Sequence, residues 1–133
     1  MAAALLQNAL PPDKKGKYSI SSAGTNADSG APATKPSVEV MRELNIDIKR
    51  HKSRLLTKEL TERADLILAL AENHVESIKG SFPNAAGKVY LLSDYSGRNR
   101  GSSISDPYGG DADTYRTTRN EIAAHTSLIA SKM

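Results

Sequence analysis

Segments in which hydrophobic residues have the spacing of a helix alternate along the chain with segments in which they have the spacing of a strand. Patterns typical of helices cover residues 1–10, 36–44, 57–62, 72–80 and 112–132. Between them, residues 18–22 alternate polar and apolar like a half-buried or edge strand, and residues 64–70 and 88–92 are continuous apolar runs of strand length. Such runs suit strands that are buried on both faces of a parallel sheet. The alternation of strands and helices therefore predicts an α/β domain with a parallel sheet.

Stretches of polar and small residues separate these elements. Residues 25–35 are rich in Gly, Ala, Asn, Asp and Pro, and residues 93–103 are rich in Gly and Ser, so both are predicted to be loops. In the last helix the pattern buries Tyr115, Ile122 and Ile129, whereas His125 is expected on the helix surface, like His74 in the helix over 72–80.

Composition narrows the protein class. A chain of 133 residues with 25% charged residues and no long apolar run predicts one soluble domain without a membrane span. No secretory signal is recognisable, so we expect a cytoplasmic protein. The net charge of +3 comes from scattered basic residues, which argues against nucleic-acid binding. The chain has no Cys and only three scattered His, so we expect no disulfide, no metal site and no thiol nucleophile within it, and no cofactor.

The stretch from Ile104 to Asp111 carries the clearest chemical signal. Pro107 fixes its own φ and keeps Asp106 out of the helical region, so the carboxylate lies on a rigid, extended corner. Two glycines then allow a tight turn into Asp111, which can cap the last helix. An Asp-Pro turn that only caps a helix is the simpler interpretation. With Tyr108 directly following, the same stretch has the layout of a general acid beside a flat substrate pocket.

The segment over residues 46–54 is ambiguous from the pattern alone. Ile46 and Ile48 alternate with polar residues, and a cluster of basic residues follows. A solvated basic loop is one interpretation. The other places His51 and one arginine of this cluster toward the interior, and Arg54 is expected to be a local ion-pair partner rather than a phosphate ligand.

Five motifs in register resemble the low-molecular-weight protein-tyrosine phosphatase family over nearly the whole chain. They are Ser22-Ala23-Gly24-Thr25, Pro32-Ala33, His51-Lys52-Ser53-Arg54 with Leu56-Thr57, Ala64-Asp65-Leu66-Ile67-Leu68, and Asp106-Pro107-Tyr108-Gly109-Gly110. The resemblance implies a flavodoxin-like three-layer α/β/α domain over residues 1–133, with four parallel strands in the family. It also implies hydrolysis of phosphate monoesters on phosphorylated proteins through a cysteinyl-phosphate intermediate.

The resemblance also implies roles for four residues. Asp106 would be the general acid for the leaving group and then the base for water, and Tyr108 would flank the substrate ring. Ser22 and His51 would support the phosphate loop by hydrogen bonds. A second aromatic residue often follows in the family, and this chain has Gly109 there instead.

One departure from the family changes the expected activity. Family members open with an apolar strand and a Cys-x5-Arg phosphate loop, and the helix after that loop resembles Met1 to Leu6 of this chain. We therefore expect an N-terminally truncated domain that lacks the first, central strand and is inactive as given, and a natural product longer by that strand and loop. A domain without its central strand is expected to unfold, or to leave two strand edges open.

Three alternatives remain open at this stage. The first is a non-catalytic module on the same fold that binds phosphoesters or proteins. The second is a phosphoarginine phosphatase, because Asp106 to Gly110, Tyr115 and the segment Thr118-Arg119-Asn120-Glu121 also resemble bacterial members with that activity. The third is a thioredoxin-coupled arsenate reductase, which the absence of Cys argues against.

Overall fold

The computed structural model describes residues 1–25 and 29–133, so part of the loop predicted over 25–35 lies outside the described residues. The two described strands are β1 (Ile67–Ala69) and β2 (Val89–Leu91), which pair in parallel with Leu68 opposite Tyr90. The α-helices are α1 (Ala2–Ala9), α2 (Lys35–Arg42), α3 (Lys58–Arg63), α4 (Glu72–Ser81), α5 (Leu92–Ser96) and α6 (Ala112–Lys132), and η1 (Lys15–Lys17) and η2 (Pro83–Lys88) are 3-10 helices. No described helix is long and apolar enough to cross a bilayer.

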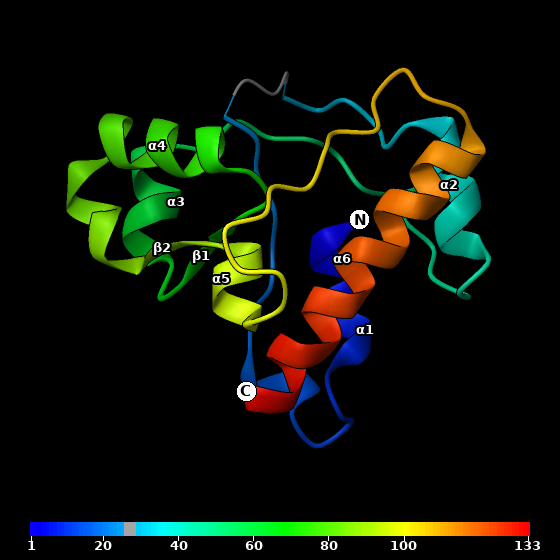
Figure 1. Ribbon diagram of the computed structural model, residues 1–133, viewed down its shortest axis with the longest axis horizontal. Coiled ribbons are helices and arrows are strands. Elements are labelled where there is room, and N and C mark those ends of the chain that lie inside the picture. The colour runs from blue at the N-terminus through cyan, green and yellow to red at the C-terminus, as the bar shows by residue number, and fades with distance from the viewer. Residues whose placement is uncertain (26–28) are drawn as a thin grey trace.

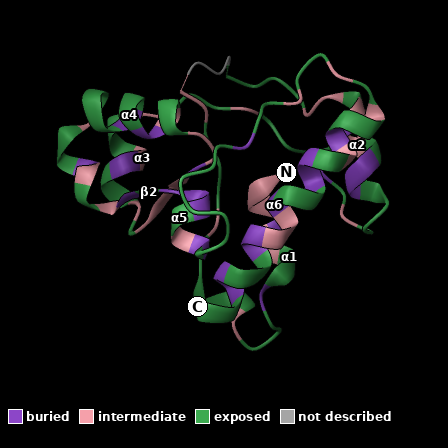
Figure 2. Ribbon diagram, in the orientation of Figure 1, coloured by how far each residue is buried: buried purple, intermediate pink, exposed green. Residues whose placement is uncertain are grey.

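Helices cover both faces of the sheet, in the α/β arrangement that the alternation predicts (Figure 1). Ile67, Ala69, Val89 and Leu91 share one face and pack in a core with α4 and η2. Leu68 and Leu70 point to the opposite face and contact a second core, built from α1, α2 and α6. Buried positions accordingly form stripes along the inner sides of the helices (Figure 2).

Three helices follow the sequence prediction closely. Asp111 caps α6, because its Oδ1 accepts a hydrogen bond from the Thr114 amide at 2.9 Å. Thr57 caps α3 in the same way through the Leu60 amide at 3.3 Å. The predicted inward residues of α4 and α6 are buried: Val75, Ile78, Tyr115, Ile122 and Ile129.

The strand predicted over residues 18–22 is wrong. No backbone hydrogen bond joins this segment to β1 or β2 in the part of the chain that the structure describes, and Tyr18 is 39% exposed. Alternation makes a segment able to join a sheet, but a strand exists only where a neighbour completes the ladder. The first pairing with another segment comes at Gly24, which forms a parallel bridge with Leu55.

The two apolar runs form shorter strands than predicted. In β2 the side chain of Tyr90 is 43% exposed, so this strand is not buried on both faces. The first residues of the loop predicted over 93–103 instead belong to helix α5, and the C-cap residue of this helix, Gly97, has φ of 81°. The α5 serines Ser93 and Ser96 bond to the Ser102 carbonyl and to His125, and local composition does not reveal such distant partners.

The expectation that His125 lies on the surface of α6 is also wrong. Its side chain is 4% exposed, and its Nδ1 lies 2.7 Å from the hydroxyl of Ser96 on α5. Helical spacing placed His125 near the edge of the buried stripe, and α5, which the sequence did not predict, covers that edge.

Candidate functional site

The Asp106-Pro107 corner lies at the carboxyl end of the sheet. The Ile104 amide donates to the Leu70 carbonyl at 2.9 Å, immediately after β1, and Ile104 itself is buried. This bond fixes the chain two residues before Asp106. Open parallel sheets bind their ligands at this end of the strands.

Two turns give the corner its shape. The Asp106 Oδ1 accepts a hydrogen bond from the Tyr108 amide at 3.0 Å, and the Gly110 amide donates to the Pro107 carbonyl at 2.8 Å. Gly109 has φ of 84°, where side chains are disfavoured, and a Cβ on Gly110 would come within 2.8 Å of Thr114 Cγ2. The glycines that the sequence singled out are therefore required by the turn.

The Asp106 carboxylate is exposed and makes no ion pair in the described part of the chain. Its Oδ1 accepts the hydrogen bond from the Tyr108 amide. Tyr108 is 79% exposed, so its ring projects from the same corner without a packing role. The structure thus keeps acid and ring together on one rigid turn.

Ser22 and His51 lie in a second group, organised by backbone pairing. The Gly24 amide donates to the Arg54 carbonyl at 2.9 Å, which brings the segment after Ser22 against the segment after His51. The Arg54 Nε then donates to the Ser22 carbonyl at 3.0 Å. Arg54 is therefore bonded to the backbone, and it remains exposed rather than pointing into the interior.

The electrostatic surroundings of His51 favour its neutral form. Although His51 is exposed and does not point into the interior, partial desolvation lowers its pKa first, and the positive charges of the Met1 amine and of Arg54 lower it further. Burial also lowers the pKa of the Met1 amine. A neutral imidazole can hydrogen-bond without adding charge to its surroundings. Sequence reasoning missed the Met1 amine, because nothing in the pattern tells that it lies near His51.

The two groups are not joined directly. Among the described residues, no hydrogen bond or ion pair connects Asp106 or Tyr108 with Ser22 or His51. A separate hollow of about 450 Å³ lies between α3, the end of α4 and η2, and none of these four residues lines it. No group of three or more acidic, His or Cys side chains within the described ranges could hold a metal ion.

Comparison with known proteins gives a consistent set of matches. The model of the family "Low molecular weight phosphotyrosine protein phosphatase" matches residues 1–132. The chain is 36% identical to the protein-arginine-phosphatase of Bacillus subtilis over 114 residues, which cover 86% of this chain and 75% of the relative. It is 41% identical to EpsP, a probable low-molecular-weight protein-tyrosine-phosphatase of Ralstonia solanacearum, over 81% of this chain and 68% of the relative.

Solved structures have the same fold. The YwlE arginine phosphatase of Geobacillus stearothermophilus superposes with a TM-score of 0.90 at 32% identity. The match covers 98% of this chain and 81% of the YwlE chain. A low-molecular-weight protein tyrosine phosphatase from T. tengcongensis gives a TM-score of 0.88 at 28% identity, covering 99% of this chain and 88% of its own. The three-layer, flavodoxin-like α/β arrangement expected from the sequence is therefore confirmed.

Proposed function

Because the chain belongs to the low-molecular-weight phosphotyrosine protein phosphatase family, we propose that it supplies the general-acid part of a site that hydrolyses phosphate esters on proteins. One observation carries the proposal. The Asp106 carboxylate stands exposed on a rigid corner that is bonded to the carboxyl end of β1 and bears an exposed ring two residues later. Proton donor and stacking surface are thus held in a fixed relation.

Asp106 acts twice in the proposed reaction. When the phosphoryl group moves from the substrate oxygen to a thiolate, the protonated Oδ2 of Asp106 gives its proton to the leaving oxygen. The carboxylate then takes a proton from the water that attacks the phosphocysteine, which restores the acid and releases phosphate. Tyr108 packs against the ring of the leaving side chain.

Ser22 and His51 belong to the support of the phosphate-binding loop in this proposal. Their segments are tied together by the backbone pairing and by Arg54. A neutral His51 can hold loop carbonyls or amides without competing for the phosphate charge. Both are positioning residues, since neither touches the transferred group.

These 133 residues supply no thiol nucleophile, because they contain no Cys. Phosphoryl transfer to sulfur requires a thiolate of low pKa at a helix N-terminus. We expect the purified chain to show no turnover of p-nitrophenyl phosphate, with near-UV circular dichroism recorded on the same sample. Turnover that disappears in Asp106→Asn would contradict this, because another residue would then carry the phosphoryl group. Phosphoester binding by a rigidly folded chain without turnover would favour the non-catalytic binding module.

A chimera tests the proposal in the positive direction. The strand and phosphate loop of the Bacillus subtilis relative are fused ahead of Met1, where the resemblance places them. We expect turnover that vanishes when the loop cysteine is replaced by serine. A chimera that folds, binds phosphate and yet turns over no ester would contradict the proposed function.

Phosphoarginine is a second candidate substrate, favoured by the 36% identity to a protein-arginine-phosphatase. Two residues of the α6 segment that resembles such enzymes have a packing role instead. Thr118 and Arg119 are buried, and the Arg119 Nη1 donates to the Val40 carbonyl at 2.8 Å, so these residues pack α2 on α6. The ratio of kcat/KM for phosphoarginine and phosphotyrosine peptides in the chimera decides between the two substrates.

A further inference from the structure

The loop that leads to Asp106 is fixed from one side by helix α5. Residues 97–105 contain no helix or strand, yet they are held at several points. The contacts are Ser93 Oγ to the Ser102 carbonyl at 2.7 Å, the Gly101 amide to Asp94 Oδ1 at 2.7 Å, the Glu72 amide to Ser103 Oγ at 3.0 Å and the Ile104 amide to the Leu70 carbonyl at 2.9 Å. Because two of these contacts come from α5, the position of Asp106 depends on where α5 lies.

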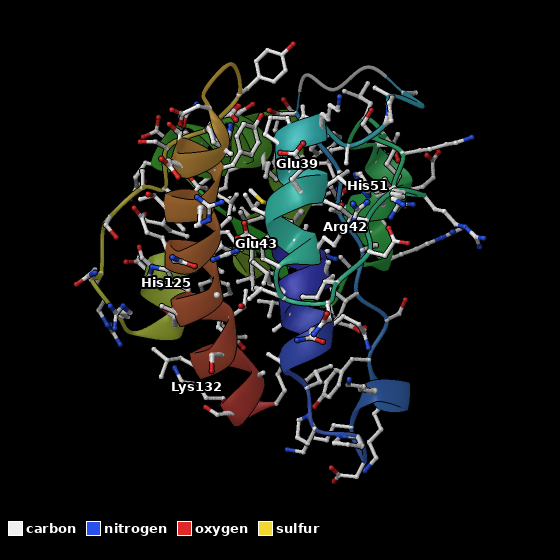
Figure 3. All side chains as sticks on the ribbon, turned by 90° about the vertical axis from the view of Figure 1, so that its right-hand side faces the viewer. Glu39, Arg42, Glu43, His51, His125 and Lys132 are labelled. Carbon is white, nitrogen blue, oxygen red and sulfur yellow. The ribbon has the colours of Figure 1, made fainter. Side chains whose placement is uncertain are left out.

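Helix α5 is in turn held against α6 by a buried pair of side chains. Ser96 and His125 are each 4% exposed, and the Ser96 hydroxyl lies 2.7 Å from His125 Nδ1. The same hydroxyl accepts a hydrogen bond from the Arg98 amide at 3.2 Å and donates one to the Ser93 carbonyl at 3.1 Å, so it also fixes the first turn of the loop on α5. In Figure 3, His125 extends from α6 on the side where α5 lies.

Charged groups of both signs surround this pair, and α5 itself carries Asp94, whose Oδ1 accepts the hydrogen bond from the Gly101 amide. Arg98 faces His125 from the loop, and Glu121 faces it from the preceding turn of α6. The Lys132 ammonium bonds to the carbonyls of Tyr95 and Ser96 at 3.1 Å each. Helix α1, which also packs on α6, has no ionisable side chain. A proton on His125 would therefore place another positive charge in a buried position near Arg98 and Lys132, with the Glu121 carboxylate nearby.

We propose that His125 is a positioning residue for Asp106, which fixes α5 and the acid-bearing loop on α6 as a neutral imidazole and releases them when it takes up a proton. That the loop is fixed follows from the contacts of α5 and α6. That this matters for catalysis rests on the proposed function of Asp106.

The direction of the pH effect follows from the burial of His125. Burial lowers the pKa of His125 first and Arg98 lowers it further, against the opposing effect of Glu121. The open state therefore binds the proton more readily than the closed one, so the closed state is fully favoured above the ordinary pKa of about 6.5 and loses stability as the pH falls below it. The loop is expected to be fixed in neutral solution and loosened in acid.

Amide hydrogen exchange in the chimera, in which the strand and phosphate loop are restored ahead of Met1, tests the proposal. We expect the amides of Gly97, Gly101 and Ile104 to be protected at pH 8 and to lose protection at pH 5, after correction for the intrinsic exchange rate. Their chemical shifts should move with the same midpoint as the ring proton of His125. In His125→Gln, which can still bond to Ser96 but cannot titrate, the protection should persist at pH 5. His74→Gln on α4 is the matched control and should behave like the parent chain.

Three results would overturn the proposal. They are loop amides equally protected at pH 8 and pH 5, the same loss of protection in His125→Gln as in the parent chain, and no protected amides in α5 and α6 at pH 8. If the glutamine variant does not fold, the coincidence of the loop midpoints with the ring proton of His125 in the parent chain still decides. No substrate enters this experiment, so a chimera that folds without turnover would refute the proposed function and leave the loop result standing.

Discussion

Glu43 shows how one carboxylate can join two helices of this fold. It accepts hydrogen bonds from Arg116 Nε at 2.9 Å and Nη2 at 2.7 Å, and from Arg119 Nη1 at 2.6 Å. Glu43 is the C-cap residue of α2, and in Figure 3 it extends toward α6. The hydrogen bonds from Arg116 and then Arg119 lower the pKa of Glu43 from 4.5 to about 2. Arg119 is 7% exposed, so this carboxylate also balances a buried guanidinium.

Glu43→Gln should lower stability at neutral pH, because the two arginines lose their charged partner. The folded pKa lies below the unfolded one, so the stabilisation by Glu43 is complete above about pH 4.5 and is lost as the pH falls toward 2. Urea midpoints are expected to differ between parent and variant at pH 7 and to converge at low pH. Glu39→Gln, on the exposed side of the same helix, is the control, and an equal effect of both variants would contradict the account.

At the residue scale, the sequence predicts side chains whose role is set by their own neighbours. Asp106, Gly109 and Asp111 act within a few residues, and the structure has the predicted turn and cap. His125 and Arg54 could not be predicted, because their partners, Ser96 and the Ser22 carbonyl, are far away along the chain.

At the element scale, helices were more predictable than strands. A helix carries its own hydrophobic period, and α6, which Asp111 also caps, appears with the bounds that the sequence predicts. A strand depends on its neighbour, so residues 18–22 remain unpaired with β1 and β2 despite their alternation. Helix α5 was missed because its serines bond to Ser102 and His125, which local composition does not reveal.

Helix α6 packs on the rest of the molecule through one buried stripe of side chains. Ile129→Ala removes a side chain of 0% exposure from the main core and should lower the free energy of unfolding by about 2–5 kcal/mol. Leu128→Ala, at the neighbouring position with 40% exposure, is the control and should change it by much less. Urea denaturation measures the two free energies of unfolding, which can be compared directly if the dependence on urea concentration has the same slope in both variants. Similar losses in the two variants would contradict the assigned face of α6.

At the scale of the whole molecule, two cores lie on opposite faces of a small parallel sheet. The loop with Asp106 leaves α5 and crosses to α6, so it connects the part of the molecule with the sheet to the part with α1 and α2 (Figure 1). The proposed acid therefore depends on contacts from both parts. The fold class was predictable from the alternation of elements, whereas this dependence required the three-dimensional arrangement.

The most direct test of the central claim is the effect of Asp106→Asn on kcat/KM of the chimera with two esters. A general acid matters most for a poor leaving group, so we predict a loss of about 10²–10⁴-fold with phenyl phosphate and a much smaller loss with p-nitrophenyl phosphate. Asp113→Asn, an exposed carboxylate in the first turn of α6, should change neither. Equal losses of Asp106→Asn with both esters, or none with phenyl phosphate, would show that Asp106 does not protonate the leaving group.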